Sequence, residues 1–167
     1  RDSIQRMFDS ANRFANFGEV IVSLHIKGIR CHADTTIEFN SPITAFSGLN
    51  GTGKSTVLQL AACAYNTPYS TAYRVSNFIV KNSLDLNSLV SGSSVKFAFW
   101  TKDASTRSLT LSYYGSWYGY NRRTRRYILY AGIGQYLPRS ESPSFMNRAR
   151  FLKVHSSTSA STRITDW

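Results

Sequence analysis

Acidic residues are scarce in this sequence of 167 residues. Nine Asp and Glu stand against twenty Lys and Arg, which gives a formal net charge of +11 at pH 7. The excess is uneven, because nine basic but two acidic residues fall within residues 122–167. A basic surface attracts nucleic acid by releasing counterions, while the same charge also serves solubility or contact with an acidic partner. Net charge alone leaves both interpretations open.

Cysteines and long apolar runs are also scarce. Cys31 and Cys63 form no C-x-x-C pair, and His32 beside Cys31 is too little for a metal site, which excludes the common zinc motifs. Two unremarkable thiols suit a reducing, cytoplasmic location. No apolar run approaches the ~20 residues of a membrane span, and residues 1–17 lack the apolar core of a signal peptide. We therefore expect no membrane partner.

A phosphate-binding motif is present. In SGLNGTGKST, residues 47–56, Gly48, Gly53, Lys54 and Ser55 satisfy the P-loop pattern G-x-x-x-x-G-K-[ST]. Glycines allow the backbone turns that point consecutive N–H groups at phosphates. The lysine reaches the β- and γ-phosphates, the serine hydroxyl takes a position on Mg²⁺, and the next helix, from Thr56, turns its positive end toward the anion. The motif predicts ATP and Mg²⁺ as cofactors.

The segments around this motif supply the strand, loop and helix that a P-loop requires. Residues 43–48 (ITAFSG) predict a short buried strand, and residues 54–65 place apolar side chains at helical spacing. This context disfavours the alternative of a glycine-rich turn that matches by accident. The other expected elements are an amphipathic helix over 1–18, strands over 19–30 and 35–40, a short helix near 72–80, and antiparallel strands over 94–101, 107–114 and 125–134.

Residues 22–65 resemble the opening of the ABC-type ATPases of the SMC, RecF and SbcC group, which also includes OLD-type nucleases and several bacterial anti-phage defence ATPases. In that pattern one strand ends in an apolar residue and arginine, the next reads like TTIEFN, and the P-loop reads G-x-N-G-x-G-K-S-T. The implied fold class is α/β: the N-lobe of an ABC-type P-loop NTPase, with a mixed sheet around the P-loop helix and an antiparallel β-subdomain. The expected domains are a helix over 1–18, the N-lobe over 19–147, and a linker or the start of a helical insertion over 148–167.

The resemblance also implies roles for individual residues. Lys54 and Gln135 are the implied catalytic residues, because Gln135 has roughly the placement of the family glutamine that helps to hold Mg²⁺ and the attacking water. Ser55 is the implied metal ligand. Arg30 matches the strand-end arginine, with a solvated turn arginine as the alternative. The implied nucleotide-binding residues are Arg30, Gly48, Asn50, Gly51, Thr52, Gly53, Lys54, Ser55 and Thr56.

Two elements that this family needs for hydrolysis are not found. A Walker B strand is an apolar run that ends in Asp and Glu, and none of Asp85, Asp103 and Asp166 follows such a run. Residues 89–94 (LVSGSS) imitate the Ser-Gly core of the family's signature motif, but they run into a strand and predict a turn. We expect an incomplete fold: the nucleotide-holding lobe of a longer protein, or of an assembly completed by another chain. A free-standing lobe would leave a sheet edge uncovered.

Two functions follow from this resemblance. One is the ATP-binding lobe of an SMC/RecF-like ATPase, which dimerises around ATP-Mg as a homodimer or with a second ATPase lobe and couples closure to DNA binding, DNA repair or anti-phage defence. The other is a nucleotide-gated regulatory or scaffold subunit, which binds ATP without hydrolysis and controls a partner effector such as a nuclease. A Walker B sequence in the complete gene separates the two.

The segment YYGSWYGYNRRTRRY, residues 113–127, joins six aromatic residues to four arginines, Arg122, Arg123, Arg125 and Arg126. Arginines pair with phosphates and aromatic rings stack on bases, so this composition suits a DNA-binding surface. The alternative is a β-hairpin with a solvated arginine turn and aromatic cross-strand pairs. We favour the hairpin, because the flanking sequence predicts strands.

Overall fold

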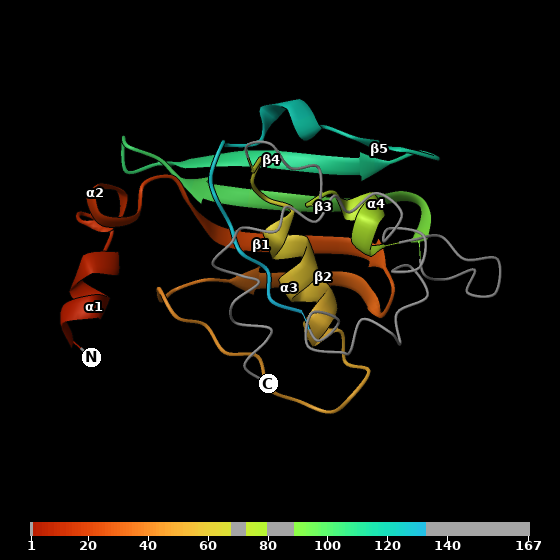
Figure 1. Ribbon diagram of the computed structural model, residues 1–167, viewed down its shortest axis with the longest axis horizontal. Helices are drawn as coiled ribbons and strands as arrows, with labels where there is room; N and C mark the ends of the chain where they lie inside the picture. Colours follow the sequence, from red (N-terminus) through yellow and green to blue (C-terminus); the bar gives the residue numbers. More distant parts are fainter. Residues whose placement is uncertain (1, 68–72, 80–88, 133–167) are drawn as a thin grey trace, which may run out of the picture. The chain divides into compact units, whose positions relative to one another are not determined.

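The structure, a computed structural model, describes residues 2–67, 73–79 and 89–132. Its five strands form one antiparallel sheet in the order β2-β1-β3-β4-β5 (Figure 1). The elements in chain order are α1 (Asp2–Phe8), α2 (Arg13–Phe17), β1 (Val20–Ile29), β2 (His32–Glu38), α3 (Lys54–Ala62), α4 (Val75–Phe78), β3 (Leu89–Trp100), β4 (Thr106–Tyr113), β5 (Trp117–Tyr118) and the 3₁₀ turn η1 (Tyr120–Arg122). The predicted α/β class is confirmed.

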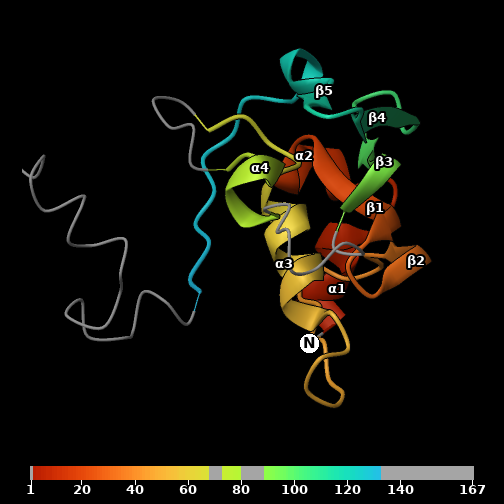
Figure 2. The ribbon, with the colours of Figure 1, turned by 90° about the vertical axis from the view of Figure 1, so that its right-hand side faces the viewer.

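The core lies between one face of the sheet and helix α3. Figure 2 shows α3 and α4 on the same side of the strands. Ile26 of β1, Phe97 of β3 and Leu111 of β4 are fully buried in one cluster with Leu60 of α3. Burial of this apolar surface is the main force that holds α3 against the sheet. The helix is therefore fixed along its length by the strands that precede and follow it in the sequence.

The opposite face of the sheet is polar. Successive side chains of a strand point to opposite faces, so the neighbours of the core residues turn away from α3. The register aligns His25 of β1 with Lys96 of β3, and Lys96 with Thr110 of β4. Lys96, Thr110 and the nearby Lys27 are exposed. An antiparallel sheet with one solvated face shows this alternation of apolar and polar residues, which is why the sequence predicts β1, β3 and β4.

The N-terminal residues form two short helices, where the sequence predicts one amphipathic helix over 1–18. The chain turns after Phe8, and the N–H groups of Asn12 and Arg13 both donate to the carbonyl of Asp9. The Arg13 guanidinium donates to the Phe8 carbonyl at 2.7 Å, and the Asn12 amide to the Arg6 carbonyl at 3.2 Å. These side chains satisfy the carbonyls at the end of α1, which stabilises the break.

Two predicted strands are not formed. Residues 43–48 belong to no strand, and residues 125–132 make one isolated parallel bridge, between Arg125 and Asn66. The sheet is therefore antiparallel in the described part of the chain, not mixed. Phe46 still packs at the rim of the core, with its ring centroid 6.4 Å from that of Phe39. One partly buried ring gives the segment an apolar pattern without a neighbouring strand. Residues 133 and 134 lie outside the described ranges.

Residues 89–94 form the first half of β3, where the sequence predicts a turn. Lys27 aligns with Ser94 and Ile29 with Leu89, so residues 90–93 bulge opposite Gly28. The buried Ser93 hydroxyl donates to the Gly28 carbonyl and accepts the N–H of Val90. The serine supplies the bonds that the interrupted strand pairing leaves unmade. A bulged strand and a turn use the same small residues, which explains the error.

The remaining predictions on organisation fall partly outside the described residues. The expected domain boundary after residue 147 and the segment 148–167 both lie there. The described residues up to Tyr130 belong to one compact unit. Within residues 2–67, 73–79 and 89–132, no helix has the length and apolar character that crossing a membrane requires.

Candidate functional site

The predicted P-loop lies at the N-terminal end of α3. Gly48, Gly51 and Gly53 have φ angles of 144°, 85° and 87°, in the region that glycine adopts at low cost. Gly53 is the N-cap of α3, and no side chain caps this end of the helix. The first N–H groups of a helix have no partner within the helix. This end of α3 therefore presents unpaired donors and the positive end of the helix dipole, which together favour an anion.

The Lys54 side chain folds back over the loop. Its Nζ donates to the carbonyl of Gly48 at 2.8 Å and to that of Leu49 at 2.6 Å, and lies 3.5 Å from Thr52 Oγ1. The ammonium is therefore held at the loop and does not extend into solvent. It has no carboxylate partner among the described residues, so its charge is compensated by carbonyl dipoles alone. A cation in this state is available to a phosphate.

Ser55 and Thr56 have different surroundings. Ser55 is exposed, and its hydroxyl makes no hydrogen bond with any residue that the structure describes. Thr56 is 4% exposed, and its hydroxyl accepts a hydrogen bond from Arg30 at 3.0 Å. Mg²⁺ takes oxygen ligands and keeps several of its waters, so an exposed, unengaged hydroxyl such as that of Ser55 fits it. Because the Thr56 hydroxyl is buried and bonded to Arg30, we expect Thr56 to contact a nucleotide through its backbone N–H.

Arg30 connects the β1–β2 turn to α3. Its backbone is left-handed, with φ of 52°. The guanidinium donates to Thr56 Oγ1 at 3.0 Å, to Gln59 Oε1 at 3.2 Å and to the carbonyl of Phe78 at 2.9 Å. Arg30 is exposed, and it still has three partners on α3 and α4. Arg30 thus lies beside the first turn of the P-loop helix, as the resemblance implies, while contact with a nucleotide stays a prediction.

Cys31 and His32, from the same turn, pack directly on the last glycine of the P-loop. A Cβ atom built on Gly53 would overlap Nε2 of His32 and lie 2.6 Å from Sγ of Cys31. His32 is buried, with Nε2 3.3 Å from the Gly53 carbonyl oxygen. The motif pattern contains neither residue, because the contact is made across the fold. The only signal in the sequence is that both follow Arg30.

At the other end of α3, two of the four arginines predicted to bind DNA are held within the fold. Arg123 Nη1 donates to the carbonyls of Cys63, Tyr65 and Tyr73, at 3.3, 2.9 and 2.8 Å. Burial lowers the pKa of Arg123, but an arginine remains charged at neutral pH. Arg126 donates to the carbonyls of Phe17 and Glu19. These two side chains bond to backbone carbonyls of the fold, whereas the DNA contact predicted for the four arginines stays a prediction.

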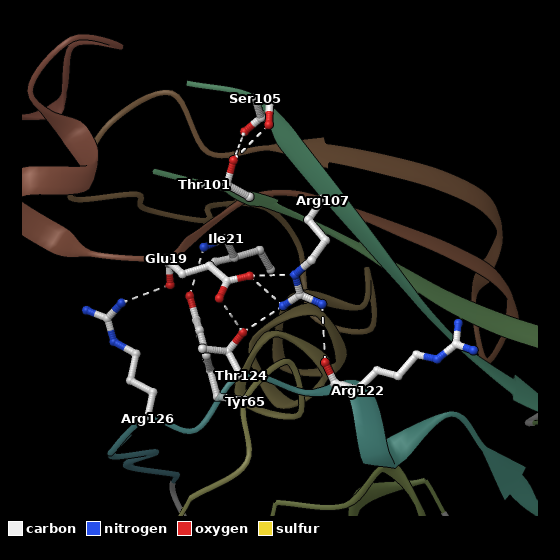
Figure 3. Close-up of polar contacts among 9 residues, drawn as sticks. All are labelled: Glu19, Ile21, Tyr65, Thr101, Ser105, Arg107, Arg122, Thr124 and Arg126. Atoms are coloured by element: carbon white, nitrogen blue, oxygen red, sulfur yellow. Dashed lines mark hydrogen bonds and ion pairs between the residues drawn. The ribbon is translucent and has the colours of Figure 1, made fainter. Parts of the chain in front are cut away.

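A polar network holds residues 122–126 in place (Figure 3). Glu19 Oε1 accepts from Nε of Arg107 at 2.7 Å, and Oε2 accepts from the Thr124 hydroxyl at 2.8 Å. Arg107 also donates to Thr124 Oγ1 and to the Arg122 carbonyl. The backbone of Asn66, just after α3, exchanges hydrogen bonds with Thr124 and Arg126. The segment is therefore fixed to the start of β1, to β4 and to the end of α3.

The hairpin alternative for residues 113–127 is half correct. β4 and β5 form a hairpin, and the rings of Tyr113 and Trp117 pair across it with centroids 5.4 Å apart. The arginines, however, lie beyond the hairpin and not in its turn. Within this segment, the exposed aromatic and basic side chains are Tyr114, Tyr118, Arg122, Arg125 and Tyr127.

The other predicted site residues are not brought to the P-loop by the described structure. Gln135, Asp85 and Asp166 lie outside the described residues. Asp103 lies in the turn between β3 and β4, where Thr101 bonds with Ser105. The described residues therefore provide a loop and cations suited to phosphate binding, and no carboxylate of theirs contacts this loop.

Comparison with known proteins agrees with this geometry. A family model described as an AAA domain matches residues 23–142. A curated protein named "DNA double-strand break repair Rad50 ATPase", from Methanococcus maripaludis, is 32% identical over 60 residues, which cover 36% of this chain and 6% of that protein. The chain thus spans a small part of the length of this relative.

Proposed function

The chain belongs to the AAA domain family and resembles the N-terminal region of SMC/RecF/SbcC-like ATPases, and we propose that residues 48–56 bind the phosphates of ATP. The observation that carries the proposal is the N-terminal end of α3. Three glycines with positive φ lead to an uncapped helix start, and the ammonium of Lys54 is held at the same loop. This arrangement gives an anion both a positive charge and unpaired N–H donors.

The residues at this site fit ATP and Mg²⁺. The backbone of Asn50, Gly51, Thr52 and Gly53 supplies N–H donors, and Lys54 supplies the charge. Ser55, exposed and unengaged within the described chain, is the proposed ligand for Mg²⁺. Bound there, the metal would neutralise phosphate charge. Arg30 lies at the edge of this site through its bond to Thr56, and we propose that it approaches the nucleotide from the hairpin turn.

Turnover requires an acidic residue to hold the metal and polarise water. We propose that this comes from another part of the assembly, either a second ATPase lobe or a further segment of the protein. A large apolar side chain of the loop itself, that of Leu49, is 82% exposed. Exposed apolar groups beside a binding loop favour a covering partner. Such an assembly is the proposed ATPase, a homodimer or a hetero-assembly.

A regulatory subunit is the second candidate. The sequence has no apolar run ending in Asp and Glu, and this favours a chain that binds ATP and controls an effector, such as a nuclease, without hydrolysis. ATP turnover by the full-length protein separates the candidates, because only the first predicts a rate that depends on Lys54.

DNA is the proposed partner of the ATPase form, in DNA repair or anti-phage defence. The name of the Methanococcus maripaludis relative places that protein in double-strand break repair. On this chain, Arg122 and Arg125 are exposed and have no side-chain partner among the described residues. Unpaired arginines are suited to phosphates of a nucleic acid backbone.

Replacement of Lys54 by alanine tests the nucleotide site. We expect Lys54→Ala to lower the affinity for a fluorescent ATP analogue, measured with Mg²⁺ by titration, by at least about tenfold, since a charge-assisted hydrogen bond is lost. The thermal unfolding midpoint should hardly change, because the side chain contacts only the loop.

The matched control is Lys96→Ala, which removes an exposed lysine from the polar face of the sheet. It should bind the analogue like the natural protein. If Lys54→Ala binds as tightly as this control, the loop is not the nucleotide site and the proposed function fails.

A further inference from the structure

His32 lies at the junction between the β1–β2 turn and the P-loop. Its side chain is 6% exposed, with Nε2 3.3 Å from the Gly53 carbonyl oxygen and Nδ1 3.3 Å from Oγ1 of Thr35. A carbonyl oxygen only accepts hydrogen bonds, so Nε2 donates to it, and in the tautomer with its proton on Nε2 alone, Nδ1 accepts from the Thr35 hydroxyl. The contact with Thr35 therefore helps to hold the ring with Nε2 toward the P-loop.

The carbonyl that His32 contacts belongs to the peptide unit that begins α3. The Gly53 carbonyl and the Lys54 N–H are parts of one planar trans peptide and point in opposite directions. The same oxygen accepts the N–H of Val57 at 3.0 Å, the first bond of the helix. A hydrogen bond to this oxygen thus sets the direction of the Lys54 N–H, which points away from His32.

The ring also sets how closely the loop approaches the turn. A Cβ atom on Gly53 would overlap His32, so the glycine backbone rests directly on the ring. Arg30, from the same turn, bonds to Thr56 in the first turn of α3 and to Gln59 in the second. Residues of the β1–β2 turn therefore contact the P-loop helix at its N-cap and along its first two turns.

We propose that His32 is a positioning residue for nucleotide binding: by donating to the Gly53 carbonyl, it orients the Gly53–Lys54 peptide so that the Lys54 N–H faces the phosphate site. This rests on the proposed function of the P-loop. His32 itself touches no nucleotide, and its effect passes through the backbone of Gly53. The alternative is that His32 serves packing alone, in which case the volume of its ring matters for binding and its N–H does not.

Two substitutions in the full-length protein separate the donor from the volume. His32→Leu keeps much of the volume and removes the N–H, whereas His32→Gln offers an amide N–H at a similar distance from the backbone. With a fluorescent ATP analogue and Mg²⁺, we expect about tenfold weaker binding for His32→Leu and a loss within about threefold for His32→Gln, in line with one hydrogen bond. Thermal unfolding of both variants is measured in parallel, and binding is titrated well below both midpoints.

Natural affinity in His32→Leu overturns the proposal, and so does an equal loss in the two variants. Lys54→Ala, titrated alongside, distinguishes failure of the His32 proposal from failure of the proposed function. If Lys54→Ala binds the analogue with natural affinity, the P-loop is not the nucleotide site. If His32→Leu does not fold, Thr35→Val replaces it, because that change removes the hydroxyl that helps to hold the ring but leaves His32 in place. We then expect about threefold weaker binding from the loss of one neutral hydrogen bond, and unchanged binding overturns the proposal.

Discussion

The two ends of α3 both lie next to cationic side chains, but the fold uses them differently. At the N-terminal end, Lys54 bonds two loop carbonyls and no side chain caps the helix. At the C-terminal end, Arg123 bonds the carbonyls of Cys63 and Tyr65, which follow the last turn. The negative end of the helix dipole is thus already neutralised, whereas the positive end is left for an anion. We call the N-terminal end the binding end, after the function proposed for residues 48–56, and the C-terminal end, bonded to Arg123, the holding end.

The two cysteines mark these two ends. Cys31 is exposed and lies against Gly53, whereas Cys63 is fully buried as the C-cap of α3, where its thiol donates to the Gln59 carbonyl. Burial raises the pKa of Cys63 to about 12, an effect that the nearby Arg123 charge offsets in part. The rate at which a reagent modifies each thiol therefore measures how accessible that end of α3 is.

Thiol labelling should show the largest contrast between the ends. At pH 8 a pKa of about 12 leaves roughly 10⁻⁴ of Cys63 as the reactive thiolate, and its burial slows the reagent further. We expect N-ethylmaleimide to modify Cys31 at least about a thousandfold faster than Cys63, measured by mass spectrometry of the two peptides. Labelling in denaturant is the control, since it should equalise the rates. Similar rates in the folded protein would mean that the C-terminal end opens as readily as the P-loop.

Replacement of Arg123 should destabilise the C-terminal end of α3. Its guanidinium satisfies three carbonyls, and we expect Arg123→Ala to lower the free energy of unfolding by about 2–4 kcal/mol, measured by urea denaturation. The matched control is Arg122→Ala, because the neighbouring side chain is exposed and should cost no more than about 0.5 kcal/mol. Equal small losses would show that the arginines of this segment are interchangeable and that the carbonyls are satisfied by water.

The sequence predicts the binding end of α3 better than the holding end, for a physical reason. A P-loop is a local pattern, in which glycine spacing and the start of a helix lie within ten residues, so the positions of Gly53 and Lys54 follow directly. The alternation of buried and exposed side chains along β1, β3 and β4 is an equally local pattern. The contact between His32 and Gly53 spans 21 residues and that between Arg123 and Cys63 spans 60, and no period in the sequence records them.

The remaining errors lie in segments whose sequence pattern is compatible with two different structures. Residues 43–48 have the apolar spacing of a strand, but a strand also needs a neighbour with free backbone groups, which local sequence does not specify. Arginine-rich residues 122–126 illustrate the same limit. Composition alone does not show that the side chains of Arg123 and Arg126 bond to backbone carbonyls, whereas those of Arg122 and Arg125 have no partner among the described residues. Tertiary contacts decide both cases.

The smallest effect is expected from Arg122 and Arg125, whose side chains have no partner in the described part of the chain, and it tests whether this surface binds DNA. If Arg122 and Arg125 contact phosphates, Arg122→Gln with Arg125→Gln should reduce the salt dependence of binding to a 30-base-pair duplex by up to about two units in the log–log slope, since each lost phosphate contact removes about 0.9. Fluorescence anisotropy over a series of salt concentrations measures the slope. Arg6→Gln with Lys102→Gln is the matched control, because it removes the same charge from exposed positions elsewhere. Equal slopes in the two double variants would assign Arg122 and Arg125 to the general field of a basic protein, and DNA contact would then have to come from another surface.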